Sequence, residues 1–181
     1  MMKKQILLVF VLIFLLMILS GCGQSYATGE VYSSSKAIVA DAKSSINEIS
    51  YDDFKQMLEK EKLRVLIDVR EPGEFNEGFI NQPDEDDEYP YPETFTVNIP
   101  RGLIEFKITS SDYWDNDLWV EMPPKDEPIV LYCLTGGRSA LAALTMQKMG
   151  YTNVYSLQGG YRIWLDPSLP LEDDSASDSG G

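Results

Sequence analysis

The sequence predicts an α/β fold, in which a single domain is built on a parallel sheet with helices on both faces. Between residues 46 and 166, short apolar runs of strand length alternate with segments that favour helix. The chain has 181 residues, which leaves room for one domain of ordinary size once both termini are set aside. Hydrophobic residues make up 44% of the chain, enough to form a packed core.

The first half of this domain supplies three of the expected strands. Residues 63–69 are mostly apolar, as is typical of a strand buried on both sides. Ser50 is placed to cap a helix whose apolar residues Phe54, Met57 and Leu58 share one face. In order, the expected elements are a strand at 46–49, a helix at 51–61, a strand at 63–69, a short helix at 72–76 and a strand at 96–99.

The second half carries the strand and the helix around Cys133. Residues 129–132 form an apolar strand that runs directly into Cys133. Residues 140–149 favour helix strongly, and Gly150 is a suitable residue just beyond the helix end. A last strand is expected at 154–157, followed by a turn that opens with Gly159 and Gly160 and carries Trp164.

The N-terminus has the features of a bacterial lipoprotein signal peptide at 1–21. Lys3 and Lys4 precede an apolar run at 6–19, which is short for a membrane span of ~20 residues. The quartet Leu-Ser-Gly-Cys at 19–22 resembles a lipobox, which implies that Cys22 is lipidated and becomes the mature N-terminus. An uncleaved anchor and ordinary secretion are the alternatives. The expected location is the extracytoplasmic face of the cell membrane, held by the lipid anchor.

Two flanking segments are not expected to fold on their own. Residues 22–45 are rich in Ser, Ala and Gly, which suits a flexible tether behind the lipidated Cys22. Residues 167–181 form an acidic tail whose final part lacks apolar anchors, a composition typical of disorder. The predicted domain therefore spans 46–166, with an acidic insertion at 81–95.

Composition excludes several classes of chemistry. The chain has no His, which removes Ser-His-Asp and Cys-His catalysis and His-based zinc sites. Cys22 and Cys133 are the two Cys residues, so no Cys-rich metal cluster and no cofactor is expected. The formal net charge of −14 should repel nucleic acid; it favours solubility over recognition of a basic partner.

Cys133 begins the segment that carries the predicted chemistry. In open α/β sheets the ligand crevice lies at the carboxyl ends of the strands, where Cys133 is expected. A helix begins near Arg138, and its N-terminus points unpaired amides at the loop, which favours a thiolate and an anion. Gly136 and Gly137 allow successive amides to turn inward, and Arg138 can bind an oxyanion. The alternative is that Cys133 is a small buried hydrophobic residue.

Several motifs occur along the chain in a specific order. They are 66–75 (Leu-Ile-Asp-Val-Arg-Glu-Pro-Gly-Glu-Phe), 78–80 (Gly-Phe-Ile), 98–100 (Asn-Ile-Pro), 132–139 (Tyr-Cys-Leu-Thr-Gly-Gly-Arg-Ser) and 157–161 (Leu-Gln-Gly-Gly-Tyr), together with Trp164. In this order they resemble the rhodanese (sulfurtransferase) family across nearly all of residues 46–166. The resemblance implies a persulfide on Cys133, a second catalytic residue in Arg138, and a surrounding cradle formed by Leu134, Thr135, Gly136, Gly137 and Ser139.

Loop length separates two chemistries among related proteins. Dual-specificity phosphatases carry one more residue between Cys and Arg, which widens the loop to hold phosphate, whereas the loop from Cys133 to Arg138 is the shorter, sulfur-type form. The residue before Cys133 is also not His, which further disfavours a phosphatase. Phe79 stands where the family usually has His; that His is not the nucleophile, so its loss is expected to be structural.

The acidic insertion is expected to lie far from the chemistry. Because it precedes the strand at 96–99, it should emerge at the amino ends of the strands, opposite Cys133. Its carboxylates can bind calcium in principle, but they lack the ligand spacing of an EF-hand loop, and a solvated acidic loop is favoured. Its two Tyr-Pro steps are suited to stiffening the loop or to presenting a surface to a partner protein.

Three further residues are expected near the crevice. Asp68 and Arg70 end the strand at 63–69 on the same edge as Cys133, and Asp68 is placed to accept hydrogen bonds from loop or helix amides. An ordinary cap at the strand end is the alternative for Asp68. Arg101 follows the motif at 98–100 and is expected to attract an anionic donor from the same side.

These features indicate a membrane-anchored sulfurtransferase. Cys133 is expected to take a sulfur atom from a small anion such as thiosulfate, a polysulfide or a persulfide. It then passes the sulfur to a thiol or another nucleophilic acceptor, while Arg138 and the loop amides stabilise the anionic states. The alternative is a non-catalytic rhodanese-like module that binds a protein at the membrane surface. The presence of both Cys133 and Arg138 favours the enzyme.

Overall fold

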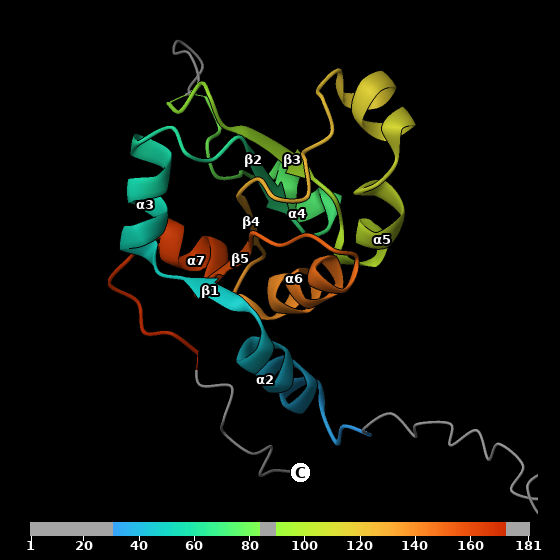
Figure 1. Cartoon of the computed structure of the whole chain (residues 1–181). Helices are drawn as coiled ribbons and strands as arrows, with labels where there is room; N and C mark the ends of the chain where they lie inside the picture. Colours follow the sequence, from blue (N-terminus) through green and yellow to red (C-terminus); the bar gives the residue numbers. More distant parts are fainter. Residues whose placement is uncertain (1–30, 84–89, 173–181) are drawn as a thin grey trace, which may run out of the picture. The chain divides into compact units, whose positions relative to one another are not determined.

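The computed structural model describes residues 31–83 and 90–172, and a five-stranded parallel sheet forms its centre (Figure 1). The sheet order is β1-β5-β4-β2-β3, so β4 lies in the middle with β5 and β2 as its neighbours. This arrangement confirms the predicted parallel α/β fold. The strands are β1 (Asn47–Ile49), β2 (Val65–Asp68), β3 (Phe95–Asn98), β4 (Ile129–Tyr132) and β5 (Val154–Leu157).

The central strand is buried on both sides, as its apolar sequence predicts. In β4, Ile129 and Leu131 belong to one core cluster, whereas Val130 and Tyr132 belong to another. The first cluster contains residues of α5 (Ile104–Lys107) and α6 (Gly137–Lys148). The second contains residues of α3 (Tyr51–Glu59), and partly buried aromatic residues of α7 (Gly160–Leu165) pack against it. Helices therefore cover both faces of the sheet (Figure 1).

Two predicted helices differ from expectation at one end each. Helix α3 begins after Ser50 as predicted, but it ends at Glu59 rather than residue 61, because Glu61 adopts a left-handed conformation with φ 52°. Helix α6 begins at Gly137, next to Arg138 where a helix start was expected, and ends at Lys148, one residue before the predicted end. Gly150, with φ 92°, follows the end of α6, as is common for a residue just past a helix.

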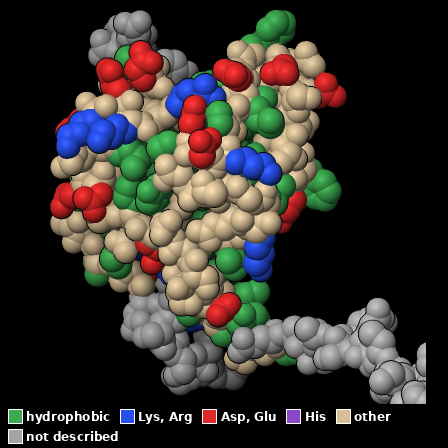
Figure 2. Space-filling model, viewed as in Figure 1, with side chains coloured by type: hydrophobic (Ala, Val, Ile, Leu, Met, Phe, Trp, Pro, Cys, Tyr) green, Lys and Arg blue, Asp and Glu red, His purple; other side chains and the backbone are tan. Residues whose placement is uncertain are grey.

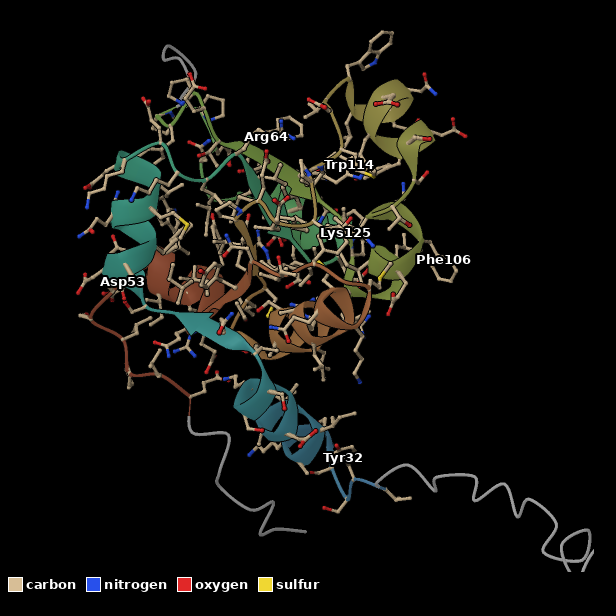
Figure 3. The ribbon with its side chains drawn as sticks, viewed as in Figure 1. Tyr32, Asp53, Arg64, Phe106, Trp114 and Lys125 are labelled. Carbon is tan, nitrogen blue, oxygen red and sulfur yellow. The ribbon has the colours of Figure 1, made fainter. Side chains whose placement is uncertain are left out.

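The helices that connect β3 to β4 were not predicted from the sequence. They are η1 (Arg101–Leu103), α5 and the π-helix η2 (Asp112–Leu118). Their buried residues Ile104, Ile108 and Trp114 join the first core cluster. Figure 3 shows Trp114 pointing into the domain and Phe106 pointing away from α5, in agreement with the 74% exposure of Phe106.

Helix α2 (Ser35–Ser45) occupies a segment for which the sequence predicted a flexible tether. The helix is capped by Ser34, whose hydroxyl accepts a hydrogen bond from the amide of Ala37 at 3.2 Å. Ala42 is fully buried, and α2 packs against α6. The tether prediction is therefore wrong for residues 35–45. The small and polar residues of this segment give weak periodicity, and packing against α6 stabilises the helix instead.

The described ends of the insertion lie at the amino ends of the strands, as predicted. The side-chain amide of Asn81 donates to the carbonyls of Tyr91 and Thr94 at 3.1 and 2.7 Å, and its oxygen accepts from the Tyr91 amide. The hydroxyl of Thr94 donates to the carbonyl of Leu63, just before β2, at 2.6 Å. Asn81 thus joins the two ends of the insertion at the edge opposite Cys133.

Several predictions fall on residues outside the described ranges. These are the signal peptide at 1–21, the lipidated Cys22, the tether up to residue 30, the acidic run at 84–89 and the tail from 173 to 181. Within residues 31–83 and 90–172, no helix combines the length and the apolar character needed to span a membrane. Figure 2 shows acidic and basic side chains interspersed over the visible face.

Candidate active site

Cys133 follows β4 directly and lies at the carboxyl edge of the sheet, where the sequence placed it. The residue that follows β2 is hydrogen-bonded to the end of β4, since the amide of Val69 donates to the carbonyl of Tyr132 at 2.9 Å. The Cys133 residue is only 1% exposed and belongs to the first core cluster. The sulfur therefore lies at the floor of the loop that leads from β4 to α6.

One loop amide points at the sulfur. The N–H of Gly136 donates to the Sγ of Cys133, with the nitrogen 3.1 Å from the sulfur. Gly136 has φ 104°, a conformation that favours glycine and that turns this amide inward. The hydroxyl of Ser139 lies 3.8 Å from Sγ and is held by the Gly136 carbonyl at 3.0 Å and by Ser156 at 2.9 Å. The loop is shaped to stabilise negative charge on sulfur.

The outer side of the loop is fastened to α7. The amide of Tyr161 donates to the carbonyl of Cys133 at 2.7 Å, and the amide of Arg162 donates to the carbonyl of Leu134 at 3.1 Å. Gly160 lies so close that a β-carbon on it would be 2.3 Å from the Cys133 carbonyl oxygen. These carbonyls are thus kept turned toward α7. Sequence analysis placed a turn at Gly159 and Gly160 but did not foresee this contact.

Arg138, in the first turn of α6, is held by Glu74 of α4 (Pro72–Asn76). The two side chains form a bidentate ion pair, with Nη1 2.6 Å from Oε2 and Nη2 2.7 Å from Oε1. The hydrogen bond from Arg138 lowers the pKa of Glu74 from 4.5 to about 2. The same bond raises the pKa of Arg138 despite partial burial, and the charge of Cys133 raises it further.

Glu74 was not among the predicted site residues, although it lies inside the motif at 66–75. The amide of Glu71 donates to Oε2 of Glu74 at 3.1 Å, so the carboxylate also caps the N-terminus of α4. Glu74 and Arg138 are 64 positions apart in the chain, and only the folded structure pairs them. The one signal available in the sequence was a second acidic residue three positions after Glu71.

Asp68 lies on the predicted edge, and within residues 31–83 and 90–172 its hydrogen bonds go to Arg70 and not to amides of the Cys133 loop. Its carboxylate accepts hydrogen bonds from the backbone N, Nε and Nη2 of Arg70, at distances between 2.6 and 3.0 Å. Both side chains are almost fully buried. Arg70 also donates to the Gly78 carbonyl at 2.7 Å and lies 4.1 Å from the centre of the Tyr161 ring. Asp68 thus binds the backbone amide two residues further on, which fits the alternative of a cap at the strand end.

Arg101 contacts α5 and α6 and not the loop. Its guanidinium donates to Glu105 at 3.1 Å and to the hydroxyl of Thr145 at 3.3 Å. Thr145 lies two turns along α6 from its N-terminus. The predicted role of Arg101 in attracting a donor therefore has no contact that supports it. Phe79, in place of the usual His, stacks on Phe75 with ring centroids 4.3 Å apart, a packing role.

The remaining predicted loop residues are Leu134, Thr135 and Gly137; in the part of the chain that the structure describes, none of them forms a hydrogen bond with Sγ. Leu134 is 42% exposed, at the surface of the loop. Thr135 borders a hollow of about 170 Å³ that is also lined by Lys43 of α2 and Gln158. Gly137 begins α6 and faces Val39 of α2. The structure thus brings together Cys133, Gly136, Arg138 and Ser139, and adds Glu74, Gly160 and the two α2 residues.

Comparison with known proteins gives consistent matches. Residues 50–167 match the family described as Rhodanese-like domain. A sulfurtransferase from Allochromatium vinosum is 29% identical over 126 residues, which cover 70% of this chain and 94% of the relative. A putative mitochondrial thiosulfate sulfurtransferase from Schizosaccharomyces pombe is 33% identical, covering 67% and 81%. A solved structure from Rhodopseudomonas palustris, of unknown function and described as a possible tyrosine phosphatase, is 30% identical with a TM-score of 0.55, covering 79% and 97%.

Proposed function

Because this chain belongs to the rhodanese-like domain family, we propose that it is a sulfurtransferase in which Cys133 carries the transferred sulfur as a persulfide. The observation that carries the proposal is the hydrogen bond from the Gly136 amide to Sγ, within a loop of the shorter type. The names of the relatives from A. vinosum and S. pombe support the same activity.

The reaction proceeds in two displacements. In the first, the Cys133 thiolate attacks the outer sulfur of thiosulfate; an S–S bond forms on Cys133, the S–S bond of thiosulfate breaks, and sulfite leaves with the electron pair. In the second, an acceptor thiolate attacks the outer sulfur of the persulfide, which restores the Cys133 thiolate and yields an acceptor persulfide. Each step conserves charge and needs no other oxidant or reductant. A polysulfide or another persulfide can replace thiosulfate in the first step.

The site residues stabilise the anionic states of this cycle. The outer sulfur of the persulfide extends about 2 Å beyond Sγ, into a loop that supplies the inward amide of Gly136. Arg138 adds a positive charge near Cys133, but Glu74 already binds both of its terminal nitrogens. Arg138 therefore serves through its fixed position and its charge. A donor that binds Arg138 directly must share the guanidinium with Glu74.

A phosphatase is the second activity to test, because the Rhodopseudomonas palustris relative is described as a possible tyrosine phosphatase. The short loop and the absence of His in the chain argue against that activity here. A non-catalytic binding module is the other alternative, and it predicts that Cys133 never acquires sulfur.

The proposal extends to cellular location. We infer that Cys22 carries a lipid that holds the protein at the extracytoplasmic face of the membrane, on the basis of Lys3, Lys4, the apolar run at 6–19 and the lipobox-like quartet. Replacement of Cys22 by Ala should abolish incorporation of labelled fatty acid. Label that still enters the variant protein would contradict the lipid anchor while leaving the sulfur chemistry untouched.

Intact-mass measurement after incubation with thiosulfate or polysulfide tests the activity. The wild-type protein should gain the mass of one sulfur atom, which cyanide or a reductant then removes, and Cys133→Ser should gain none. Arg138→Ala should keep the thiol and take up sulfur more slowly. The same samples should not hydrolyse p-nitrophenyl phosphate. A wild-type protein that never gains sulfur from any of these donors would favour the binding module, and phosphate release would favour the phosphatase.

A further inference from the structure

Helix α2 lies against Gly136 of the Cys133 loop and against Gly137, the first residue of α6. A β-carbon on Gly137 would lie 3.5 and 3.6 Å from the two γ-carbons of Val39. A β-carbon on Gly136 would lie 3.9 Å from the Nζ of Lys43. Val39 and Lys43 are four positions apart, so they share one face of the helix, and that face is turned toward the loop.

This contact comes from outside the part of the chain that matches the family. The match covers residues 50–167, whereas α2 spans Ser35–Ser45. The helix is fixed in place by the fully buried Ala42 and by its packing against α6, whose first residue is Gly137. The position of Lys43 is therefore a property of this chain beyond its matched segment.

Lys43 and the sulfur both lie close to Gly136. The amide of Gly136 donates to Sγ at 3.1 Å, and the Lys43 ammonium approaches the Cα side of Gly136. The path from the Lys43 ammonium to Sγ consists of the 3.9 Å contact, the covalent bonds within Gly136 and the 3.1 Å hydrogen bond. The ammonium therefore lies within roughly 10 Å of the sulfur, about one Debye length at 0.1 M salt. The Lys43 side chain is only 18% exposed, so its charge is screened less than that of a surface lysine.

Two carboxylates share this neighbourhood and modify the effect of Lys43. Glu48 lies 3.8 Å from the Lys43 ammonium, and Glu172 pairs with Arg162 at 2.7 Å. Lys43, Glu48 and Glu172 all border the hollow that reaches Thr135 of the loop. Removal of Lys43 would leave Glu48 as an added negative charge beside the loop, and removal of the Glu48 charge would have the opposite effect.

We propose that Lys43 is a positioning residue for sulfur transfer, whose ammonium, held beside Glu48 at the outer side of the loop, favours the approach of anionic donors to Cys133. The inference rests on the proposed sulfurtransferase function and names a residue of α2 as part of its site. Lys43 acts through the electric field at the loop and not by contact with the sulfur. Its effect must therefore depend on salt and on the charge of the reagent.

The full-length protein provides the test, with thiosulfate as the donor. We expect Lys43→Met to lower the rate constant for sulfur uptake by roughly three- to tenfold at low salt, with the difference shrinking at high salt. Lys43→Arg should restore the rate, and Glu48→Gln should raise it. Lys36→Met, in the same helix but about 10 Å farther along its axis, is the matched control and should react like wild type.

Alkylation of Cys133 separates this inference from the proposed function. Lys43→Met should slow the reaction with anionic iodoacetate more than the reaction with neutral iodoacetamide, whether or not thiosulfate is a substrate. A Lys43→Met protein that matches wild type in both assays, or that shows an equal deficit at all salt concentrations together with a lower melting temperature, would overturn the role of Lys43. A protein with the expected alkylation ratio but no sulfur uptake would overturn the sulfurtransferase function alone, and one that undergoes neither reaction would overturn both.

Discussion

The two edges of the sheet are held together by different interactions. At the carboxyl edge, the ion pairs Asp68–Arg70 and Glu74–Arg138 surround a loop with a glycine in a left-handed conformation. At the amino edge, Asn81 and Thr94 fasten the insertion through neutral hydrogen bonds to backbone carbonyls, and the ion pairs of Arg64 with Glu121 and Glu127 are partly exposed to solvent. A buried charge pair and close backbone contacts thus fix the edge that holds the sulfur. The other edge accommodates an inserted segment without disturbing that geometry.

The two edges should differ most in the free energy of unfolding that is lost when a buried charge loses its partner. Arg70→Met leaves the fully buried Asp68 carboxylate unpaired, which should lower the free energy of unfolding by about 3–5 kcal/mol. Asn81→Ala, at the opposite edge, removes neutral hydrogen bonds and should cost about 1–3 kcal/mol. Urea denaturation of both variants measures the contrast. Equal losses would mean that charge pairing does not distinguish the two edges.

The next largest effect on stability should come from disturbing the close contact between Gly160 and the Cys133 carbonyl at the carboxyl edge. Gly160→Ala forces a β-carbon toward the Cys133 carbonyl at a residue with φ 60°, which should cost about 1–3 kcal/mol of stability. Sulfur uptake should fall by roughly tenfold or more, because the loop must shift. Gly73→Ala is the control, since no atom lies within 4 Å of its added β-carbon. If Gly160→Ala retained full activity, the attachment of the loop to α7 would not matter for the chemistry.

The Glu74–Arg138 pair should give the carboxyl edge a sensitivity to acid. The pKa of Glu74 is lowered from 4.5 to about 2, so the stability from this ion pair is fully present above pH 4.5. That contribution is lost as the pH falls toward 2. Melting temperatures from pH 6 to pH 2 should therefore decline less steeply for Glu74→Gln than for wild type. The exposed Glu77→Gln serves as the control, and a curve for Glu74→Gln that parallels the wild type would exclude this contribution.

The smallest effect is expected from shortening the insertion. Replacement of residues 84–89 by a short Gly-containing turn keeps Asn81, Tyr91 and Thr94, which fasten the ends of the insertion. Because this edge lies opposite Cys133, the rate of sulfur uptake should remain within a few-fold of wild type. A loss comparable to that of Cys133→Ser would show that the two edges are coupled.

The sequence predicted the sheet well because its strands are short apolar runs with clear bounds. Residues 129–132 and 154–157 coincide with β4 and β5, and the Cys133 loop was placed at the correct edge. Helix α2 was missed because buried Ala42 and tertiary packing, rather than periodicity, hold it in place. Glu74 was missed because its partner is distant in the chain. For Asp68 the sequence left two interpretations open, because a strand-end carboxylate does not reveal which nearby donors it binds.

The attachment of the loop to α7 has a consequence for how the sulfur-loaded state can be observed. The amides of Tyr161 and Arg162 donate to the carbonyls of Cys133 and Leu134, so these two N–H groups report on the backbone that carries the sulfur. Their NMR signals should shift when the persulfide forms and return when the acceptor removes the sulfur. Tyr161 and Arg162 thus provide spectroscopic reporters that follow turnover without chemical labelling of Cys133.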